Sequence, residues 1–395
     1  MSAPEPQLVL PGFANVHSHA FQRLLRGDVQ RRDPARADDS FWTWREAMYS
    51  LALTLGLDDL RAAARLCYAE CLEAGYTAVG EFHYLHHDRD GAPWAPDPLA
   101  AARAHLAAAR DVGIRVTLLH TVYARGGVET PLLPRQRRFA THALDDVARA
   151  LDGLAADDHV DGVRARVGLA IHSVRAVPRA WLGPLAELAR ARALPLHAHV
   201  SEQPREVADC RAAHGLSPVA LLAAEGVLGP DLTAVHATWL DPEDVALLAE
   251  HGVTVALCPT TEGDLGDGVP DTPALHAAGV PLCVGSDSHA VIDPFAELRL
   301  LEYQARARTG RRCVVTDAAG AVAPALARIG HDHGYRALGL PADGDRVHLR
   351  AGDRALEATR DPLAAALVGG HRGLVDRVEV AGELVVSGGR ALASE

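Results

Sequence analysis

The chain has 395 residues, of which 48% are hydrophobic and 23% are charged, the balance of an ordinary globular protein with a large core. Its net charge of −12 argues against a protein that binds nucleic acid or an anionic membrane by general electrostatic attraction. No run of about 18 apolar residues is present, and Pro4 and Pro6 interrupt the segment where a secretory signal would need its apolar core. We therefore expect no membrane span and a cytoplasmic location.

Two features of the composition constrain the chemistry. The six cysteines include no Cys-x-x-Cys pair, so we expect buried free thiols in a reducing compartment. The chain contains no lysine, and all 39 basic residues are arginine. A mechanism that needs a lysine nucleophile, a Schiff base or a carboxylated lysine between two metal ions is therefore excluded.

The segment from Pro11 to Gln22 contains two histidines at close spacing. It follows the apolar run 8–10, so we place it at the end of a β-strand. His17 and His19 are two residues apart and project from the same face of a strand. Two imidazoles at a strand end form half of a metal site, although a pair of polar loop residues is the plainer alternative.

An aromatic segment, Phe41 to Arg45, follows an irregular polar section at 27–40. We interpret it as an active-site loop in which aromatic side chains hold the guanidinium of Arg45 in place for an anion. The alternative is a core patch beside a solvated arginine.

From residue 58 onward, apolar strands alternate with amphipathic helices. The predicted helices span 58–74, 99–112, 144–155, 179–193, 204–224, 242–251, 294–307 and 317–329. The predicted strands span 77–84, 114–123, 163–171, 196–200, 232–235, 253–257 and 281–284. Together with the strand before His17, this alternation favours an α/β fold, a (β/α)8 barrel of the TIM type, over residues 11–340. A doubly wound open sheet is the alternative, but no Gly-x-Gly-x-x-Gly follows the first strand.

The two ends of the chain differ from this pattern. Residues 1–10 are predicted to form a strand segment that leads into the barrel or joins a small β-subdomain. Short strands separated by Gly-rich turns, at 346–349, 374–380 and 383–386, predict that residues 341–395 form most of this subdomain.

Several predicted strands end in residues of the types that bind metals. A barrel gathers the carboxyl ends of its strands around one mouth, so these residues are expected to meet there. They are His17, His19, His197 or His199, His236 and Asp287, with Glu202 just beyond its strand. Three imidazoles and a carboxylate suit a borderline divalent ion, most often zinc, with a position left for water. A single histidine at a strand end is more often structural, and only the joint placement favours the site.

These motifs resemble the amidohydrolase superfamily. The likeness rests on Pro11-Gly12 before His17-Ser18-His19, on His199 with Glu202, on His236 and on Gly285-Ser286-Asp287. Within the superfamily, residues 17–23, 41–49, 81–84, 172–177 and 201–203 resemble the formimidoylglutamate deiminases of bacterial histidine degradation. The likeness extends from about residue 10 to 310.

The resemblance implies a single divalent metal ion, most often Zn²⁺, and a set of site residues. The metal ligands would be His17, His19, His199 and Asp287. The catalytic residues would be Gln22, Glu202, His236 and Asp287, and the substrate would be bound by Arg45, Tyr84, His172 and Arg175. The implied reaction is hydrolytic deimination of N-formimidoyl-L-glutamate to N-formyl-L-glutamate and ammonia by a metal-activated water.

Two other functions remain open at this stage. A related aminohydrolase for a heterocyclic amidine, such as guanine or cytosine, would use the same metal chemistry without needing both Arg45 and Arg175. A non-catalytic scaffold on the same fold would be expected to have lost metal ligands, whereas all four are present.

The resemblance also bears on the ends of the chain and on its partners. Only sixteen residues precede His17, fewer than in the family, which predicts an incomplete small β-subdomain or a start codon assigned too late. The expected partners are a small-molecule substrate and a second copy of the chain in a homodimer.

Overall fold

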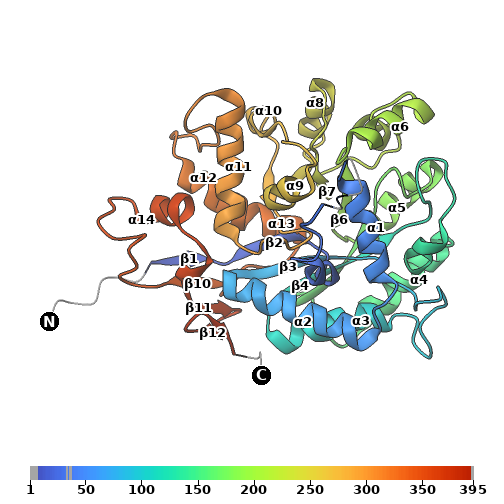
Figure 1. Ribbon diagram of the computed structural model, residues 1–395, viewed down its shortest axis with the longest axis horizontal. Coiled ribbons are helices and arrows are strands. Elements are labelled where there is room, and N and C mark those ends of the chain that lie inside the picture. The colour runs from blue at the N-terminus through green and yellow to red at the C-terminus, as the bar shows by residue number, and fades with distance from the viewer. Residues whose placement is uncertain (1–7, 33, 35–37, 393–395) are drawn as a thin grey trace.

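The computed structural model describes residues 8–32, 34 and 38–392 (Figure 1). Eight parallel strands lie side by side in chain order and form the barrel. They are β2 (Phe13–Ser18), β3 (Tyr76–His83), β4 (Arg115–Val122), β5 (Ala165–Ile171), β6 (Leu196–Val200), β7 (Leu232–His236), β8 (Thr254–Leu257) and β9 (Leu282–Val284). The predicted (β/α)8 barrel is confirmed.

Helices follow the strands and surround the barrel (Figure 1). They are α2 (Leu57–Ala74), α3 (Ala100–Val112), α4 (Leu144–Ala155), α5 (Arg179–Ala191), α6 (Pro204–His214), α7 (Pro218–Ala224), α8 (Pro242–Glu250), α9 (Pro259–Leu265), α10 (Thr272–Ala277), α11 (Pro294–Thr309) and α12 (Val322–Arg328). The start of α8 is capped, since the carboxylate of Asp241 accepts a hydrogen bond from the backbone N–H of Asp244. In the described part of the chain, no helix is long and apolar enough to cross a membrane.

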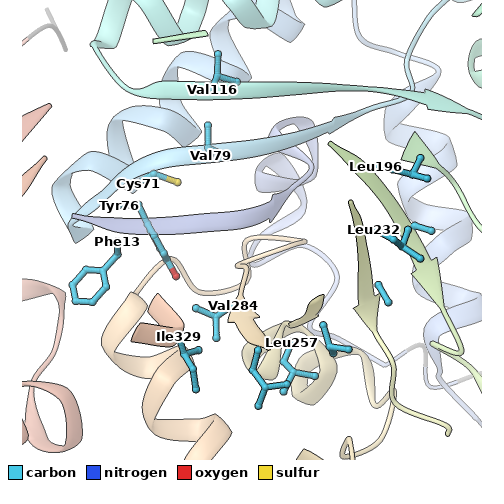
Figure 2. Packing of buried hydrophobic residues seen from close by; sticks show 14 of the residues in the cluster. Phe13, Cys71, Tyr76, Val79, Val116, Leu196, Leu232, Leu257, Val284 and Ile329 are labelled. Carbon is cyan, nitrogen blue, oxygen red and sulfur yellow. The ribbon is translucent and has the colours of Figure 1, made fainter. Parts of the chain in front are cut away.

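The outer face of the barrel carries most of the core. Val79, Val116, Leu196 and Leu232 project from their strands and are fully buried (Figure 2). They belong to one hydrophobic cluster that also includes the inner faces of the surrounding helices. Burying such side chains stabilises the fold by about 1.5–3 kcal/mol each. The barrel is therefore a rigid support for residues at its strand ends.

A second sheet lies beside the barrel. It is antiparallel, with the order β1 (Val9–Pro11), β10 (Arg346–Leu349), β11 (Val375–Val380), β12 (Glu383–Ser387) and β13 (Arg390–Ala391). The turn at Ala381-Gly382 joins β11 to β12, and both residues have positive φ angles, 53° and 78°. A short helix, α14 (Pro362–Ala364), lies between β10 and β11 in the chain.

The apolar residues before His17 belong to the second sheet rather than to the first barrel strand, because β1 pairs with β10 and the chain changes sheet at Gly12. A Cβ at Gly12 would lie 2.1 Å from Oγ1 of Thr77, so only glycine fits this crossing. One local prediction is wrong, because the segment from Phe41 is not a loop but a helix, α1 (Phe41–Ala52). Thr43 Oγ1 accepts a hydrogen bond from the N–H of Ser40 and so satisfies the start of this helix.

The amino-terminal end of the barrel is closed by a short helix, α13 (Gly334–Leu338). The hydroxyl of Thr117 on β4 donates to the carbonyl of Leu338 at 2.7 Å. Nε2 of His197 on β6 donates to the carbonyl of Ala337 at 3.0 Å. This end of the barrel is therefore packed, and the opposite end is where a site can open.

Candidate active site

Four predicted metal ligands meet at the carboxyl-terminal end of the barrel. His17 lies on β2, His19 just beyond it, His199 on β6 and Asp287 just after β9. The Nε2 atoms of His17 and His199 are 3.0 Å apart, and Oδ1 of Asp287 is 3.3 Å from Nε2 of His17 and 3.4 Å from Nε2 of His19. The alternative ligand on β6, His197, lies at the closed end, where it is hydrogen-bonded to the carbonyl of Ala337.

The outer nitrogens of two of these histidines are held by backbone carbonyls. Nδ1 of His19 donates to the carbonyl of Phe82 at 3.1 Å, and Nδ1 of His199 donates to the carbonyl of His172 at 2.8 Å. Each Nε2 therefore presents a lone pair to the cluster. A carbonyl bound to the outer nitrogen is the usual support of a metal-ligating histidine.

The electrostatics of the cluster favour neutral imidazoles. Burial, and then the neighbouring His17, lower the pKa of His19 to about 3. Burial also lowers the pKa values of His17 and His199 well below the ordinary value, and neighbouring histidines add to both shifts. Lone pairs facing one another repel unless a cation lies between them, and Nδ1 of His17 has no hydrogen-bond partner among the residues that the structure describes. Neutral nitrogens and one carboxylate fit a divalent metal ion.

The closure of the barrel itself brings Asp287 to this cluster. The N–H of Asp287 donates to the carbonyl of His17 at 2.9 Å, and the N–H of His19 donates to the carbonyl of Asp287 at 3.2 Å. A Cβ at Gly285 would lie 2.8 Å from both Cβ and N of His17, so glycine is required there. Asp287 has a φ of 47° in the left-handed region. Backbone pairing therefore places its carboxylate against both histidines.

A buried glutamate on β3 fixes the segment between the two histidines. Glu81 is 1% exposed and accepts hydrogen bonds from the hydroxyl of Ser18 at 2.7 Å and from the N–H of Ala20 at 2.9 Å. Burial raises its pKa to about 7. The sequence places Glu81 in the motif 81–84 but predicts no role for it, because its partners lie more than sixty positions away along the chain.

His236, at the end of β7, lies among three carboxylates. Its Nε2 is 3.8 Å from Asp287 and 3.9 Å from Glu202, and its Nδ1 is 3.4 Å from Glu262 on α9. Burial lowers the pKa of His236, but the hydrogen bond to Glu262 and the charges of Glu202 and Asp287 outweigh it and raise the pKa to about 10. His236 also lies within metal-binding reach of His17 and His199, and of Cys258 with Glu262. Sequence reasoning missed Glu262, which follows the end of β8.

A pocket with about 110 Å³ of free volume opens beside the cluster, which suits a small molecule rather than a polymer. All of the predicted site residues except His17 line it, and His17 lies behind them, fully buried. The predicted residues on the pocket wall are His19, Gln22, Arg45, Tyr84, His172, Arg175, His199, Glu202, His236 and Asp287. The structure thus brings together predicted residues from six of the eight strand ends and from α1.

The substrate-facing residues differ in how they are held. Gln22 donates from Nε2 to the hydroxyl of Tyr84 at 2.9 Å. The guanidinium of Arg45 lies 4.5 Å from the ring centroid of Trp42, and in the described part of the chain its buried Nε has no hydrogen-bond partner. Arg175 is already paired, at 2.7 Å with Glu202 and at 3.2 Å with Glu206. The predicted role of Arg175 in carboxylate binding therefore stays a prediction.

Comparison with known proteins places the chain in a family. A model of the amidohydrolase family matches residues 8–341. The chain belongs to the amidohydrolase family. The predicted enzyme class, a hydrolase that acts on C–N bonds, is confirmed together with the resemblance on which it rested.

Individual relatives are deaminases and deiminases. Formimidoylglutamate deiminase of Pseudomonas aeruginosa is 37% identical over 402 residues, covering 98% of this chain and 86% of that protein. 8-Oxoguanine deaminase of the same organism is 28% identical, covering 91% of this chain and 78% of that protein.

Solved structures agree with the fold. An amidohydrolase from Brucella melitensis has a TM-score of 0.89 and 37% identity, covering 97% of this chain and 86% of that one. An adenosine deaminase from Xanthomonas campestris with bound zinc has a TM-score of 0.80 and 23% identity, covering 98% and 82%. The second likeness concerns the fold alone.

Proposed function

We propose that this chain hydrolyses N-formimidoyl-L-glutamate to N-formyl-L-glutamate and ammonia. The observation that carries the proposal is the arginine of α1, Arg45, held by aromatic rings in the same small pocket as the histidine and aspartate cluster. A substrate with an amidine at one end and carboxylates elsewhere matches both halves of this pocket. Similarity along nearly the whole chain to a protein named formimidoylglutamate deiminase supports the same choice.

We assign one divalent ion, preferably zinc, to His17, His19, His199 and Asp287. When bound, such an ion supplies Lewis acidity and lowers the pKa of water, so that a nucleophile is present at neutral pH. The neutral imidazoles and their carbonyl supports favour this set over the alternative that includes His236.

The remaining groups move protons and stabilise charge. Asp287 accepts a proton from the attacking water, and Glu202 moves protons from the water to the imino nitrogen, which gains two of them and departs as ammonia. His236 lies between these two carboxylates and stabilises the negative charge of the tetrahedral intermediate. Gln22 hydrogen-bonds the imino group.

Four residues hold the rest of the substrate. Arg45 and Arg175 bind its carboxylates, and Arg175 exchanges part of its pairing with Glu202 to do so. Tyr84 and His172, whose ring centroids are 5.6 Å apart, form the wall between these arginines and the metal ligands. An acidic protein needs such local cations to bind a dicarboxylate against its overall charge.

The test is ammonia release from N-formimidoyl-L-glutamate by the zinc-loaded protein, with guanine and cytosine assayed in parallel. Formation of ammonia and N-formylglutamate is expected. Release of glutamate and formamide would move the cleaved bond to the other side of the formimidoyl carbon. Turnover of a heterocycle alone would favour a related aminohydrolase, and no turnover by metal-loaded protein would favour a non-catalytic scaffold.

Arginine variants sharpen this assay. Arg45→Met is expected to raise KM for N-formimidoyl-L-glutamate about tenfold or more, because a charged hydrogen bond is lost. Arg149→Met, at an exposed arginine outside the pocket, is the matched control. Equal KM values in both variants would contradict the proposed role of Arg45.

The predicted homodimer and cytoplasmic location belong to the same proposal. Native mass spectrometry of the purified protein and fractionation of cells that express the chain would test them.

A further inference from the structure

Three buried polar residues form a connected group on one wall of the active-site pocket. Tyr49 lies on α1, Tyr123 follows β4, and Gln136 lies on the 3₁₀ helix Pro134–Phe139. Their side chains are 2%, 4% and 0% exposed, respectively. Both tyrosines line the pocket, whereas Gln136 lies behind them. None of the three was singled out by sequence reasoning.

The orientation of the Gln136 amide is determined by its neighbours. Its Oε1 accepts a hydrogen bond from the backbone N–H of Leu133 at 2.9 Å, and an N–H can only donate. The Nε2 group therefore faces the phenols. It donates to the hydroxyl of Tyr49 at 3.0 Å and to the hydroxyl of Tyr123 at 2.9 Å.

Counting protons shows that one donor is left over. The group contains two amide N–H protons and two phenolic protons. Both amide protons are used on the phenol oxygens, and the two hydroxyls, 3.2 Å apart, share a single hydrogen bond in which either one donates. The second hydroxyl proton has no acceptor among the described residues. A buried donor without an acceptor lowers the stability of the folded chain by about 1–3 kcal/mol, unless a ligand accepts its hydrogen bond.

The surroundings of this donor favour an anionic acceptor. The guanidinium of Arg45 lies 5.5 Å from the ring centroid of Tyr49, and Arg175 lines the same pocket. Burial, and then Tyr49, raise the pKa of Tyr123 well above its ordinary value, so the phenol keeps its proton. A neutral hydroxyl beside guanidinium groups forms its strongest hydrogen bond with a carboxylate.

We propose that Tyr49 and Tyr123 donate their spare hydroxyl proton to a carboxylate of the substrate and so determine its specificity, with Gln136 as the positioning residue. The inference deepens the proposed function and rests on it for the identity of the substrate. A heterocycle without a carboxylate would leave the donor unsatisfied, so the tyrosine pair selects against it.

The variants Tyr49→Phe and Tyr123→Phe test the contact directly. Each is expected to raise KM for N-formimidoyl-L-glutamate by about tenfold, with a smaller change in kcat, because one substitution removes the hydroxyl that donates to the carboxylate and the other removes the hydroxyl bond that orients this donor. Tyr335→Phe is the matched control, since this buried tyrosine lies at the closed end of the barrel and bonds Thr77 and Asp345. KM values within twofold of the control would overturn the proposal.

The variant Gln136→Glu separates positioning from packing, because it keeps the shape of the side chain. A carboxylate would accept protons from both phenols, leaving no donor for the substrate, and it would add a negative charge beside the bound carboxylate. KM is therefore expected to rise further, by about a hundredfold. An effect of Gln136→Glu no larger than that of Tyr123→Phe would contradict the assigned role.

Two analogues identify the carboxylate. N-formimidoyl-4-aminobutyrate lacks the α-carboxylate, and N-formimidoyl-L-2-aminobutyrate lacks the γ-carboxylate. Tyr123→Phe is expected to weaken the binding of only one analogue, the one that retains the carboxylate contacted by the tyrosine pair. Equal losses for both analogues would show a general disturbance of the pocket and would overturn the proposal.

Calorimetric binding of glutarate to the metal-loaded protein separates this inference from the proposed function, because it needs no turnover. If the wild-type chain binds glutarate more tightly than the Tyr→Phe variants but does not hydrolyse N-formimidoyl-L-glutamate, the proposed function fails and the carboxylate site stands. If the chain hydrolyses the substrate but all variants bind glutarate equally, only the inference fails.

Discussion

The two ends of the barrel use the same residue types in different ways. His197 and His199 lie on one strand, β6, and both point into the barrel, but only His199 belongs to the ligand cluster. At the closed end, α13 offers a backbone carbonyl to His197, and burial lowers its pKa to about 4. At the open end, histidine nitrogens face one another and a carboxylate instead. The partner that the fold provides, rather than the residue itself, decides whether a histidine is structural or available for chemistry.

Metal removal should have the largest effect, because it acts only on the open end. Dialysis against a chelator is expected to abolish measurable turnover and to lower the melting temperature, since an ion that binds only the folded chain stabilises it. Readdition of zinc should restore both. Metal content, ammonia release and thermal melting measured on the same samples test this, and full activity without metal would contradict the assigned ligands.

Asp287→Asn should have the next largest effect. The backbone of Asp287 closes the barrel through hydrogen bonds to His17 and His19, which the substitution keeps. The side-chain amide of asparagine cannot accept the proton of the attacking water. Turnover is expected to fall by about 10²- to 10⁴-fold, with a melting temperature close to that of the wild type. Asp332→Asn, at an exposed position, is the control. A kcat near the wild-type value would rule out this role of Asp287.

His197→Leu changes the closed end alone. The substitution leaves the carbonyl of Ala337 without its donor in a buried position, so we expect a loss of about 1–3 kcal/mol in the free energy of unfolding. Metal content and KM should not change, whereas His199→Leu should lose metal. Urea denaturation and metal analysis of both variants test the difference between the two ends. Metal loss from His197→Leu would contradict the purely structural role of the closed end.

Much of this arrangement could be predicted from the sequence. The strand ranges were correct within a few residues, since hydrophobic runs separated by helices are a local signal. Because the carboxyl ends of barrel strands meet at one end of the barrel, the sequence also predicted that His17, His236 and Asp287 lie close together. The alternation of side chains put His197 and His199 on the same face, and the strand direction puts His199 nearer the mouth. The partner of His197 could not be predicted, because it depends on where α13 lies.

The parts that sequence reasoning missed depend on contacts between distant segments. Glu81 gains its role from Ser18, 63 positions earlier, and Gln136 from Tyr49, 87 positions earlier. Phe41 was placed in a loop because aromatic clustering suggested a binding surface, while the hydrogen bonds of Ser40 and Thr43 start a helix there. Composition and periodicity carry no information about such pairings.

The smallest expected effect concerns the segment that joins the open end to the second sheet. Glu70 on α2 bonds Arg23 and Arg26, which follow the histidine pair, and Arg372 near β11. Although burial raises the pKa of Glu70, hydrogen bonds from these arginines outweigh it and lower the pKa to about 2. Because the folded pKa lies below the ordinary value of 4.5, this stabilisation is present above pH 4.5 and is lost as the pH falls towards 2.

Glu70→Gln should therefore lower the free energy of unfolding by about 1–2 kcal/mol at pH 7 and by progressively less below pH 4.5. Glu187→Gln, on the exposed face of α5, is the matched control. Urea denaturation at a series of pH values measures the difference between each variant and the wild type. A difference that stayed constant from pH 7 to pH 3 would mean that the charge of Glu70 does not hold the two regions together, and that packing between α2 and the second sheet is sufficient.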